Sequence, residues 1–186
     1  MSFEYLTEPG DGPQWQGALP GRPDAFFLQR GEGEHAMLFT DLFTVLLSGD
    51  ETGGQFGVFT MQAPAGQLIP AHNHHGTHEV FYVVDGSVRV FVADQDGTKR
   101  SRRLGAGDFG FVPAGLVHAY QVEEAAQVLG VATGGFERFF QQMGQPTDHA
   151  TTDQPPFIPD FPRMQAAAQA HDMEFRPDFD WSDAQG

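Results

Sequence analysis

Short apolar stretches separated by glycine-rich turns run through residues 26–132, and this pattern constrains the fold more than any other feature of the chain. The turn signals are GDETGG (49–54), APAG (63–66), VDGS (84–87) and DQDG (94–97). Short strands between such turns are typical of an antiparallel sandwich or barrel. The sequence therefore predicts an all-β fold, with a β-barrel core at residues 26–132.

The segments on either side of this core have different patterns. Residues 1–25 are rich in Gly and Pro and predict an irregular N-terminal arm. In FERFFQQMG (136–144) the apolar residues recur at helical spacing, and a second short helix is expected around residues 163–170. Five aromatic residues further along are expected to anchor the tail on the barrel: Phe157, Phe161, Phe175, Phe179 and Trp181. We expect one domain, residues 1–186, whose residues 133–186 form a helical and irregular tail packed on the barrel.

The stretch HEVFYVVDGSVRVFV (78–92) predicts a β-hairpin, because Asp85-Gly86 suits a two-residue turn. Such a turn pairs Val83 with Val88, Phe81 with Val90 and Glu79 with Val92, and places Glu79 on the inward face. The outward face would carry Val80, Tyr82 and Phe91, which is too apolar to leave in water. We therefore expect a terminal arm or a second subunit to cover it.

Composition excludes several classes of function. The net charge of −15 argues against nucleic acid as a partner, and KRSRR (99–103) is interpreted as an edge strand protected by charge. The absence of Cys excludes disulfides, zinc–thiolate sites and thiol nucleophiles. No apolar run approaches the ~20 residues of a membrane span, and the first residues lack the pattern of a signal peptide. We expect a cytoplasmic protein with no membrane partner.

Four polar side chains in two stretches have the composition of a metal site. His72 and His74 are two residues apart, so both point the same way from an extended segment. Glu79 follows on the inward face, and His118 comes just after the turn PAG (113–115). Three imidazoles and one carboxylate suit a divalent first-row metal that keeps positions open for substrate or water.

The remaining histidines are assigned no part in metal binding. His75 and His78 lie beside the ligand set, and strand alternation is expected to turn them toward solvent or the pocket rim. His35, His149 and His171 have no motif context. The chain also has 18 Phe, more than a core of this size needs, which suits a pocket for a flat apolar ligand.

The spacing of these residues resembles the two motifs of the cupin superfamily. The first motif is matched in full by Gly66-x5-His72-x-His74-x4-Glu79-x6-Gly86. The second is matched by Gly107-x5-Pro113-x-Gly115-x2-His118, although Val122 stands where the family often has Asn. The resemblance implies the double-stranded β-helix, or jelly-roll barrel, with a few short C-terminal helices. It is weak support for any one reaction, because cupins carry out many.

A closer resemblance covers most of the chain and is to bacterial monocupin quercetinases, the flavonol 2,4-dioxygenases. It rests on residues 69–92, on GDFGFVPAGLVHAY (107–120), on GFERFFQQMG (135–144) and on the Phe- and Pro-rich tail. The resemblance implies that His72, His74, Glu79 and His118 bind one divalent transition metal per chain. Nickel, cobalt or manganese is favoured, while iron, copper or zinc is possible. It also implies a homodimer that opens the central ring of a flavonol such as quercetin with O2, releasing carbon monoxide and a depside.

In the implied mechanism the metal acts as a Lewis acid on the flavonol 3-hydroxyl, and Glu79 is the catalytic residue that takes its proton. Two alternatives remain open. One is another cupin dioxygenase acting on a different enolic or phenolic substrate. The other is a non-catalytic cupin that binds a metal or small molecule in a sensing role.

Overall fold

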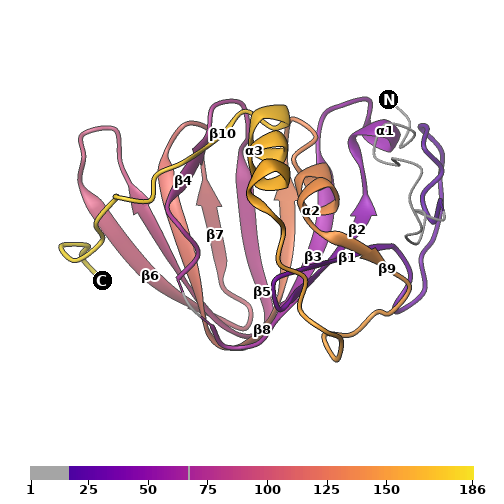
Figure 1. The fold of residues 1–186 in the computed structure, drawn as a ribbon, viewed down its shortest axis with the longest axis horizontal. Helices are drawn as coiled ribbons and strands as arrows, with labels where there is room; N and C mark the ends of the chain where they lie inside the picture. The colour runs from indigo at the N-terminus through magenta and orange to yellow at the C-terminus, as the bar shows by residue number, and fades with distance from the viewer. Residues whose placement is uncertain (1–16, 67) are drawn as a thin grey trace.

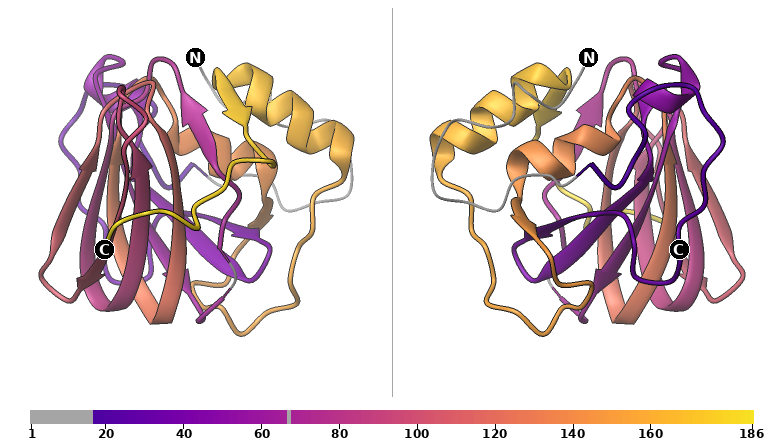
Figure 2. Two further views of the ribbon diagram at one scale, coloured as in Figure 1. Left: turned by 90° about the vertical axis from the view of Figure 1, so that its left-hand side faces the viewer. Right: turned by 90° about the vertical axis from the view of Figure 1, so that its right-hand side faces the viewer.

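The computed structural model describes residues 17–66 and 68–186, and their strands form one strongly curved antiparallel sheet (Figures 1 and 2). Most of the expected N-terminal arm, residues 1–16, lies outside the described part of the chain, as does Gln67. The elements in chain order are β1 (Glu34–Leu38), β2 (Asp41–Leu47), α1 (Gly49–Thr52), β3 (Gly57–Ala63), β4 (His72–His74), β5 (Glu79–Ala93), β6 (Lys99–Gly105), β7 (Phe109–Val112), β8 (Val117–Ala132), α2 (Glu137–Met143), β9 (Gln145–Thr147), α3 (Phe161–Ala170) and β10 (Met173–Phe175).

Two long strands, β5 and β8, hold the sheet together. They pair along almost their whole length, from Glu79 opposite Ala132 to Ala93 opposite Val117. The other side of β5 pairs with β6 and β7, while the other side of β8 pairs with β3 and with the short strand β4. Beyond β3 the order continues through β2 and β1 to β9. The all-β jelly-roll expectation is confirmed.

The predicted hairpin at Asp85-Gly86 is wrong. A type I′ turn needs a positive φ at both central residues, and here Gly86 has φ +72° while Asp85 does not adopt the left-handed region. The chain instead continues as one bent strand, and its register against β8 shifts between Val83 and Val88. Glu79, Val83, Val88 and Val90 are nevertheless buried, so the inward face was identified correctly.

Among the described residues, the tail covers the outward face of β5 at only one of its ends. The ring of Phe91 lies 5.6 Å from that of Trp181, which belongs to the C-terminal tail. At the other end Tyr82, Val84 and, on the neighbouring strand β7, Phe109 and Phe111 are between 42% and 62% exposed. The tail thus covers part of the apolar face and leaves a patch formed by these four residues.

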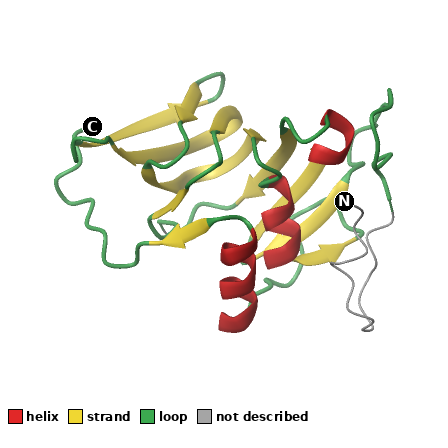
Figure 3. Ribbon diagram, turned by 90° about the horizontal axis from the view of Figure 1, so that it is seen from above, coloured by secondary structure: helices red, strands yellow, loops and turns green. Residues whose placement is uncertain are grey.

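Helices α2 and α3 lie side by side on one side of the sheet (Figures 2 and 3). The predicted stripe of α2 is buried, and Phe140 stacks on Phe43 of β2 with ring centroids 3.9 Å apart. Arg138 and Gln141 of the same helix bind the buried carboxylate of Glu34 in β1, at 2.7 and 2.9 Å. Apolar packing and a buried ion pair therefore fix α2 against the barrel.

The tail after α2 returns to the barrel at several points. Phe157 forms a bridge with Phe39, and Phe175 in β10 pairs with His72 in β4. The ring of Phe179 lies tilted against that of Trp181, at 4.6 Å between ring centroids. Phe161, in contrast, is 72% exposed, so its expected role as an anchor is wrong. It is the first residue of α3 and lies at the rim of the cavity described below.

The basic stretch KRSRR forms most of β6, which pairs with β5 on one side, and three of its four cations are paired with acids. Lys99 binds Asp183 and Arg100 binds Asp94, while Arg103 binds Glu123 and Glu124. This agrees with a charged edge strand. Among the described helices none is long and apolar enough to cross a membrane.

Gly86 offers a test of why β5 bends instead of turning. A Cβ on Gly86 would overlap the carbonyl of Ala125 on β8, whereas a Cβ on Gly97, which also has positive φ, would meet nothing. We expect Gly97→Ala to lower the free energy of unfolding by about 1 to 2 kcal/mol, the cost of the left-handed conformation. Gly86→Ala should cost about 1 to 3 kcal/mol more, because β8 must move. Chemical denaturation measures both; equal losses would show that the close approach is not required.

Candidate metal centre

Three imidazoles meet inside the barrel because β4 and β8 are paired in one register. His72 on β4 lies directly opposite His118 on β8, and His74 follows two residues later on the same face of β4. All three side chains are buried. One ring nitrogen from each lies within 4.8 Å of the other two, a grouping that could hold a metal ion.

Backbone carbonyls orient two of the three rings. Nδ1 of His72 lies 2.8 Å from the carbonyl oxygen of Pro70, and Nδ1 of His118 lies 3.0 Å from that of Leu116. Because a carbonyl can only accept, each Nδ1 must carry a proton and donate it. The Nε2 atoms of both rings are thereby directed at the cluster. A histidine that binds a metal through one ring nitrogen usually donates a hydrogen bond from the other nitrogen in this way.

Glu79, the first residue of β5, lies against two of the imidazoles. Its Oε2 is 3.0 Å from Nε2 of His118, and its Oε1 is 3.5 Å from Nε2 of His74. Burial by itself would raise the pKa of Glu79, but the hydrogen bond from His118 and the charges of the imidazoles bring that pKa down to about 2. The carboxylate is therefore ionised at neutral pH.

The imidazoles respond to the same surroundings in two ways. Burial lowers the pKa of His72 to about 3 and that of His74 to about 4, so both rings are neutral at physiological pH. Burial also acts to lower the pKa of His118, but the hydrogen bond and charge of Glu79 outweigh it and the pKa is raised. Neutral imidazole and ionised carboxylate are the protonation states in which these side chains bind metals.

One further observation indicates that these residues suit a divalent metal. Both ring nitrogens of His74 are buried and have no hydrogen-bond partner among the described residues. Burying an imidazole without a partner is costly unless something else satisfies it. A metal ion bound by Nε2 of His74, together with His72 and His118, would satisfy that nitrogen.

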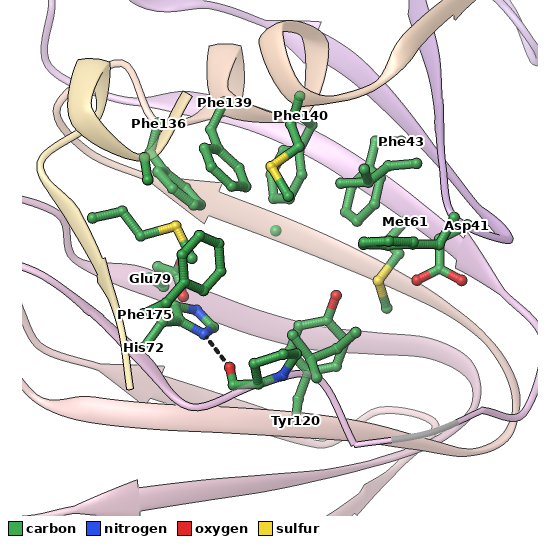
Figure 4. A pocket seen from close by; sticks show the side chains of 18 of the residues that line it. Asp41, Phe43, Met61, His72, Glu79, Tyr120, Phe136, Phe139, Phe140 and Phe175 are labelled. Atoms are coloured by element: carbon green, nitrogen blue, oxygen red, sulfur yellow. Dashed lines mark hydrogen bonds between the residues drawn. The ribbon is translucent and has the colours of Figure 1, made fainter. Parts of the chain in front are cut away.

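A cavity of about 560 Å³ opens beside these residues, a size suited to a small organic ligand (Figure 4). Strands β2, β3 and β8 form one wall, and α2 and α3 form the other. Phe136, Phe139, Phe140 and Met143, the predicted helical stripe, line it together with Phe43, Phe59, Met61, Phe81 and Phe175. The stripe is therefore both a packing face and a cavity wall.

Three polar residues that the sequence analysis did not identify also line the cavity: Asp41, Tyr120 and Gln165 of α3. Asp41 begins β2 and Tyr120 lies on β8, two residues beyond His118. Figure 4 shows His72 and Glu79 on one side of the cavity, Asp41 on the opposite side, and the hydroxyl of Tyr120 directed into the space between. One sequence signal could have identified Asp41: it is an acidic residue in the apolar strand DLFTVLL and shares a strand face with Phe43.

Two of the other histidines, His75 and His78, lie where they were expected, and a third, His171, does not. His75 and His78 are exposed, and Nδ1 of His78 accepts a hydrogen bond from the Ala114 amide. His171, in contrast, lies close enough to His74 to act on its pKa, and its ring is 5.8 Å from that of Phe139. No local pattern marked His171, because it reaches the site through the return of α3.

Comparisons with known proteins support the interpretation of the fold and the motifs. Residues 59–132 match the family described as "Cupin domain". The chain is 30% identical to a quercetin 2,3-dioxygenase of Bacillus subtilis, over 75% of this chain and 40% of that protein. It is also 30% identical to a quercetin 2,3-dioxygenase of Aspergillus japonicus, over 64% of this chain and 35% of that protein. The match thus spans less than half the length of either relative.

A structural comparison gives the same fold. Oxalate decarboxylase from Bacillus subtilis aligns over 62% of this chain and 31% of its own, with a TM-score of 0.51 and 22% identity. Together with the sequence matches, this confirms the resemblance to cupins and to quercetinases.

Metal content tests the cluster directly. We expect His74→Ala and His118→Ala each to lose most of the bound metal, because three imidazoles and one carboxylate leave no spare protein ligand. His75→Ala is the matched control, since it removes an exposed imidazole next to the cluster, and it should keep its metal. The measurement is elemental analysis of the purified variants. Wild-type occupancy in both ligand variants would rule out the assignment.

Proposed function

Because the chain carries a cupin domain related to quercetin 2,3-dioxygenases, we propose that it is a metal-dependent dioxygenase that cleaves the central ring of flavonols such as quercetin. The reaction consumes O2 and releases carbon monoxide and a depside. One observation carries the proposal: a buried three-histidine cluster with an adjoining carboxylate faces a cavity of about 560 Å³ whose walls are mainly aromatic and aliphatic.

In this proposal His72, His74, Glu79 and His118 hold one divalent transition metal. Nickel, cobalt or manganese is favoured, and iron, copper or zinc is also compatible with a set of three nitrogens and one oxygen. Loading displaces the proton between Nε2 of His118 and Glu79, since that nitrogen must offer its lone pair. The metal supplies Lewis acidity toward an enol oxygen of the substrate.

The residues of the chain account for the rest of the chemistry. Glu79 is ionised and buried, so one of its oxygens is available to accept the proton of the flavonol 3-hydroxyl. Phe136, Phe139 and Phe140 form an apolar wall that excludes water from the deprotonated, electron-rich substrate. A flat aromatic substrate also gains affinity by packing against these rings.

The same cavity bears on the alternative functions. A small dicarboxylic acid would find no Lys or Arg among the described residues that line it, although charged ligands need such partners. A sensing cupin would bind a flavonol without consuming oxygen. An enzyme for a different enolic or phenolic substrate would share the metal site, and the oxygen-uptake assay below separates it by substrate.

Glu79→Gln distinguishes catalysis from binding. The amide keeps an oxygen that can coordinate weakly, so we expect the variant to retain much of its metal. It is not basic, so oxygen uptake with quercetin should fall by about 10²- to 10⁴-fold. An oxygen electrode measures uptake, and detection of carbon monoxide identifies the product. His74→Ala, as the comparison, should lose metal and uptake together.

Two results would contradict the proposal. Normal turnover by metal-loaded Glu79→Gln would show that Glu79 is not the base. A wild-type protein that binds quercetin but never consumes oxygen, whichever divalent metal is loaded, would favour the sensing function.

We also propose a homodimer formed through the patch of Tyr82, Val84, Phe109 and Phe111. This patch is uncharged in a strongly acidic chain. It spans the paired strands β5 and β7, and the outer edge of β7 is unpaired among the described residues. Burial of such side chains contributes about 25 cal/mol per Å². A second copy of the chain therefore suits this face better than an unlike charged partner.

Sedimentation tests the dimer. We expect the wild-type chain to sediment as a dimer and Phe109→Ser/Phe111→Ser to sediment as a monomer, because the substitutions remove the apolar surface. Ile158→Ser is the control, since Ile158 is also exposed but lies far along the chain in the tail. A wild-type monomer at high concentration would refute the proposal.

A further inference from the structure

We infer that the part of the cavity away from the histidines is a recognition subsite for a phenolic hydroxyl on an outer ring of the substrate, with Asp41 at its far end and Tyr120 between Asp41 and the histidines. This inference rests on the proposed function and adds a determinant of substrate specificity to it. The 3-hydroxyl would lie toward Glu79, while a hydroxyl at the far end of the same flat molecule would meet Asp41. The two ends together would fix the direction in which the substrate enters.

The carboxyl group of Asp41 is buried but poorly satisfied. Asp41 is 7% exposed and shares its strand face with Phe43, so it points into the cavity. Among the described residues its one hydrogen-bond donor is Thr40, whose hydroxyl lies 3.1 Å from Oδ1. Nothing described donates to Oδ2. An ionised carboxylate accepts several hydrogen bonds, so this group has capacity left for a ligand.

Tyr120 carries the second polar atom of the subsite. It follows His118 on the same face of β8, and its hydroxyl has no hydrogen-bond partner among the described residues. Burial raises the pKa of Tyr120 well above its ordinary value, and the charges of Asp41 and Glu79 add to the effect. Its hydroxyl thus lies within the electrostatic reach of both carboxylates, between the two ends of the cavity.

The surroundings of Asp41 argue against a role in stabilising the fold. The neighbouring wall is formed by Phe43, Met61 and Phe59, and no cation lines the described cavity. Burial accordingly raises the pKa of Asp41 to about 6. A carboxyl group held in such a place with one hydrogen bond destabilises the fold, and an apolar residue of similar size would be better tolerated. Its presence is explained by a ligand that donates a hydrogen bond to it.

A binding cycle tests the subsite with two protein variants and two ligands. The ligands are quercetin, which has hydroxyls on both outer rings, and 3-hydroxyflavone, which has none. Metal-loaded wild type and Asp41→Leu are titrated with each under anaerobic conditions, so that calorimetry reports binding without turnover. Differences in ligand hydrophobicity cancel in the cycle, and what remains is the coupling between Asp41 and the ring hydroxyls.

We expect Asp41→Leu to weaken quercetin binding about ten-fold or more, as for hydrogen bonds to a charged group, and to leave 3-hydroxyflavone nearly unchanged. Asp41→Asn, which retains a hydrogen-bonding group, should show a smaller loss, and Tyr120→Phe should weaken quercetin selectively as well. Thermal melting of Asp41→Leu should equal or exceed that of wild type. Galangin, with hydroxyls on only one outer ring, identifies the ring that is recognised.

The outcomes separate this inference from the proposed function. Suppose that wild type binds and oxidises flavonols, but Asp41→Leu weakens the binding of both ligands equally or changes the binding of neither. The inference then fails and the dioxygenase proposal stands. Loss of folding in both Asp41→Leu and Asp41→Asn would assign Asp41 a structural role and also overturn it. If wild type binds neither quercetin nor 3-hydroxyflavone with any divalent metal, the proposed function fails and the subsite fails with it.

Discussion

The pairing of β8 with two different partners is the constraint on which the site depends. Opposite β4 it places His118 against His72. Opposite β5 it pairs Glu79 with Ala132 at the far end of β8, and the curved sheet then brings the Glu79 carboxylate within 3.0 Å of His118 across the interior. The same strand carries Tyr120 two residues on. A slip of one residue would turn His118 and Tyr120 to the other face together. The ligand cluster and the cavity wall are therefore set by a single register, and the long contact between β5 and β8 stabilises that register.

The parts of this arrangement that follow local rules were accessible from the sequence. Alternation predicted that His72 and His74 share a face, that His75 points away and that Glu79 points inward, and the motif spacing brought in His118. The hairpin was mispredicted because Asp85-Gly86 satisfies turn statistics, whereas the actual path depends on a distant strand: Gly86 packs against the backbone at Ala125. His171 and Asp41 were missed for a related reason. Their positions depend on how α3 and β2 close the cavity, which no local pattern records.

The charges buried at the histidine cluster are confined to one pair of side chains. Without a cation, the cluster keeps two neutral imidazoles and confines charge to the pair formed by Glu79 and His118. Such an arrangement is costly to bury, and the unsatisfied nitrogens of His74 add to that cost. The packing of α2 against Phe43 and the ion pair of Arg138 with Glu34 stabilise the wall beside it. A firmly packed wall next to a cluster with unpartnered nitrogens suits a pre-organised metal site.

The cavity has a carboxylate at each end, the Tyr120 hydroxyl between them and walls that are otherwise mainly apolar, and this distribution constrains the shape of what enters it. Aromatic walls alone would accept a flat molecule in either direction, because ring packing has little directional preference. Hydrogen-bonding groups at one end alone would fix the position of the ligand but would not select for its length. With Glu79 and His72 at one end and Asp41 at the other, a ligand satisfies both only if its polar groups are separated by an extended aromatic frame. Selectivity for such a frame therefore arises from the cost of leaving Asp41 without a donor as much as from the metal centre itself.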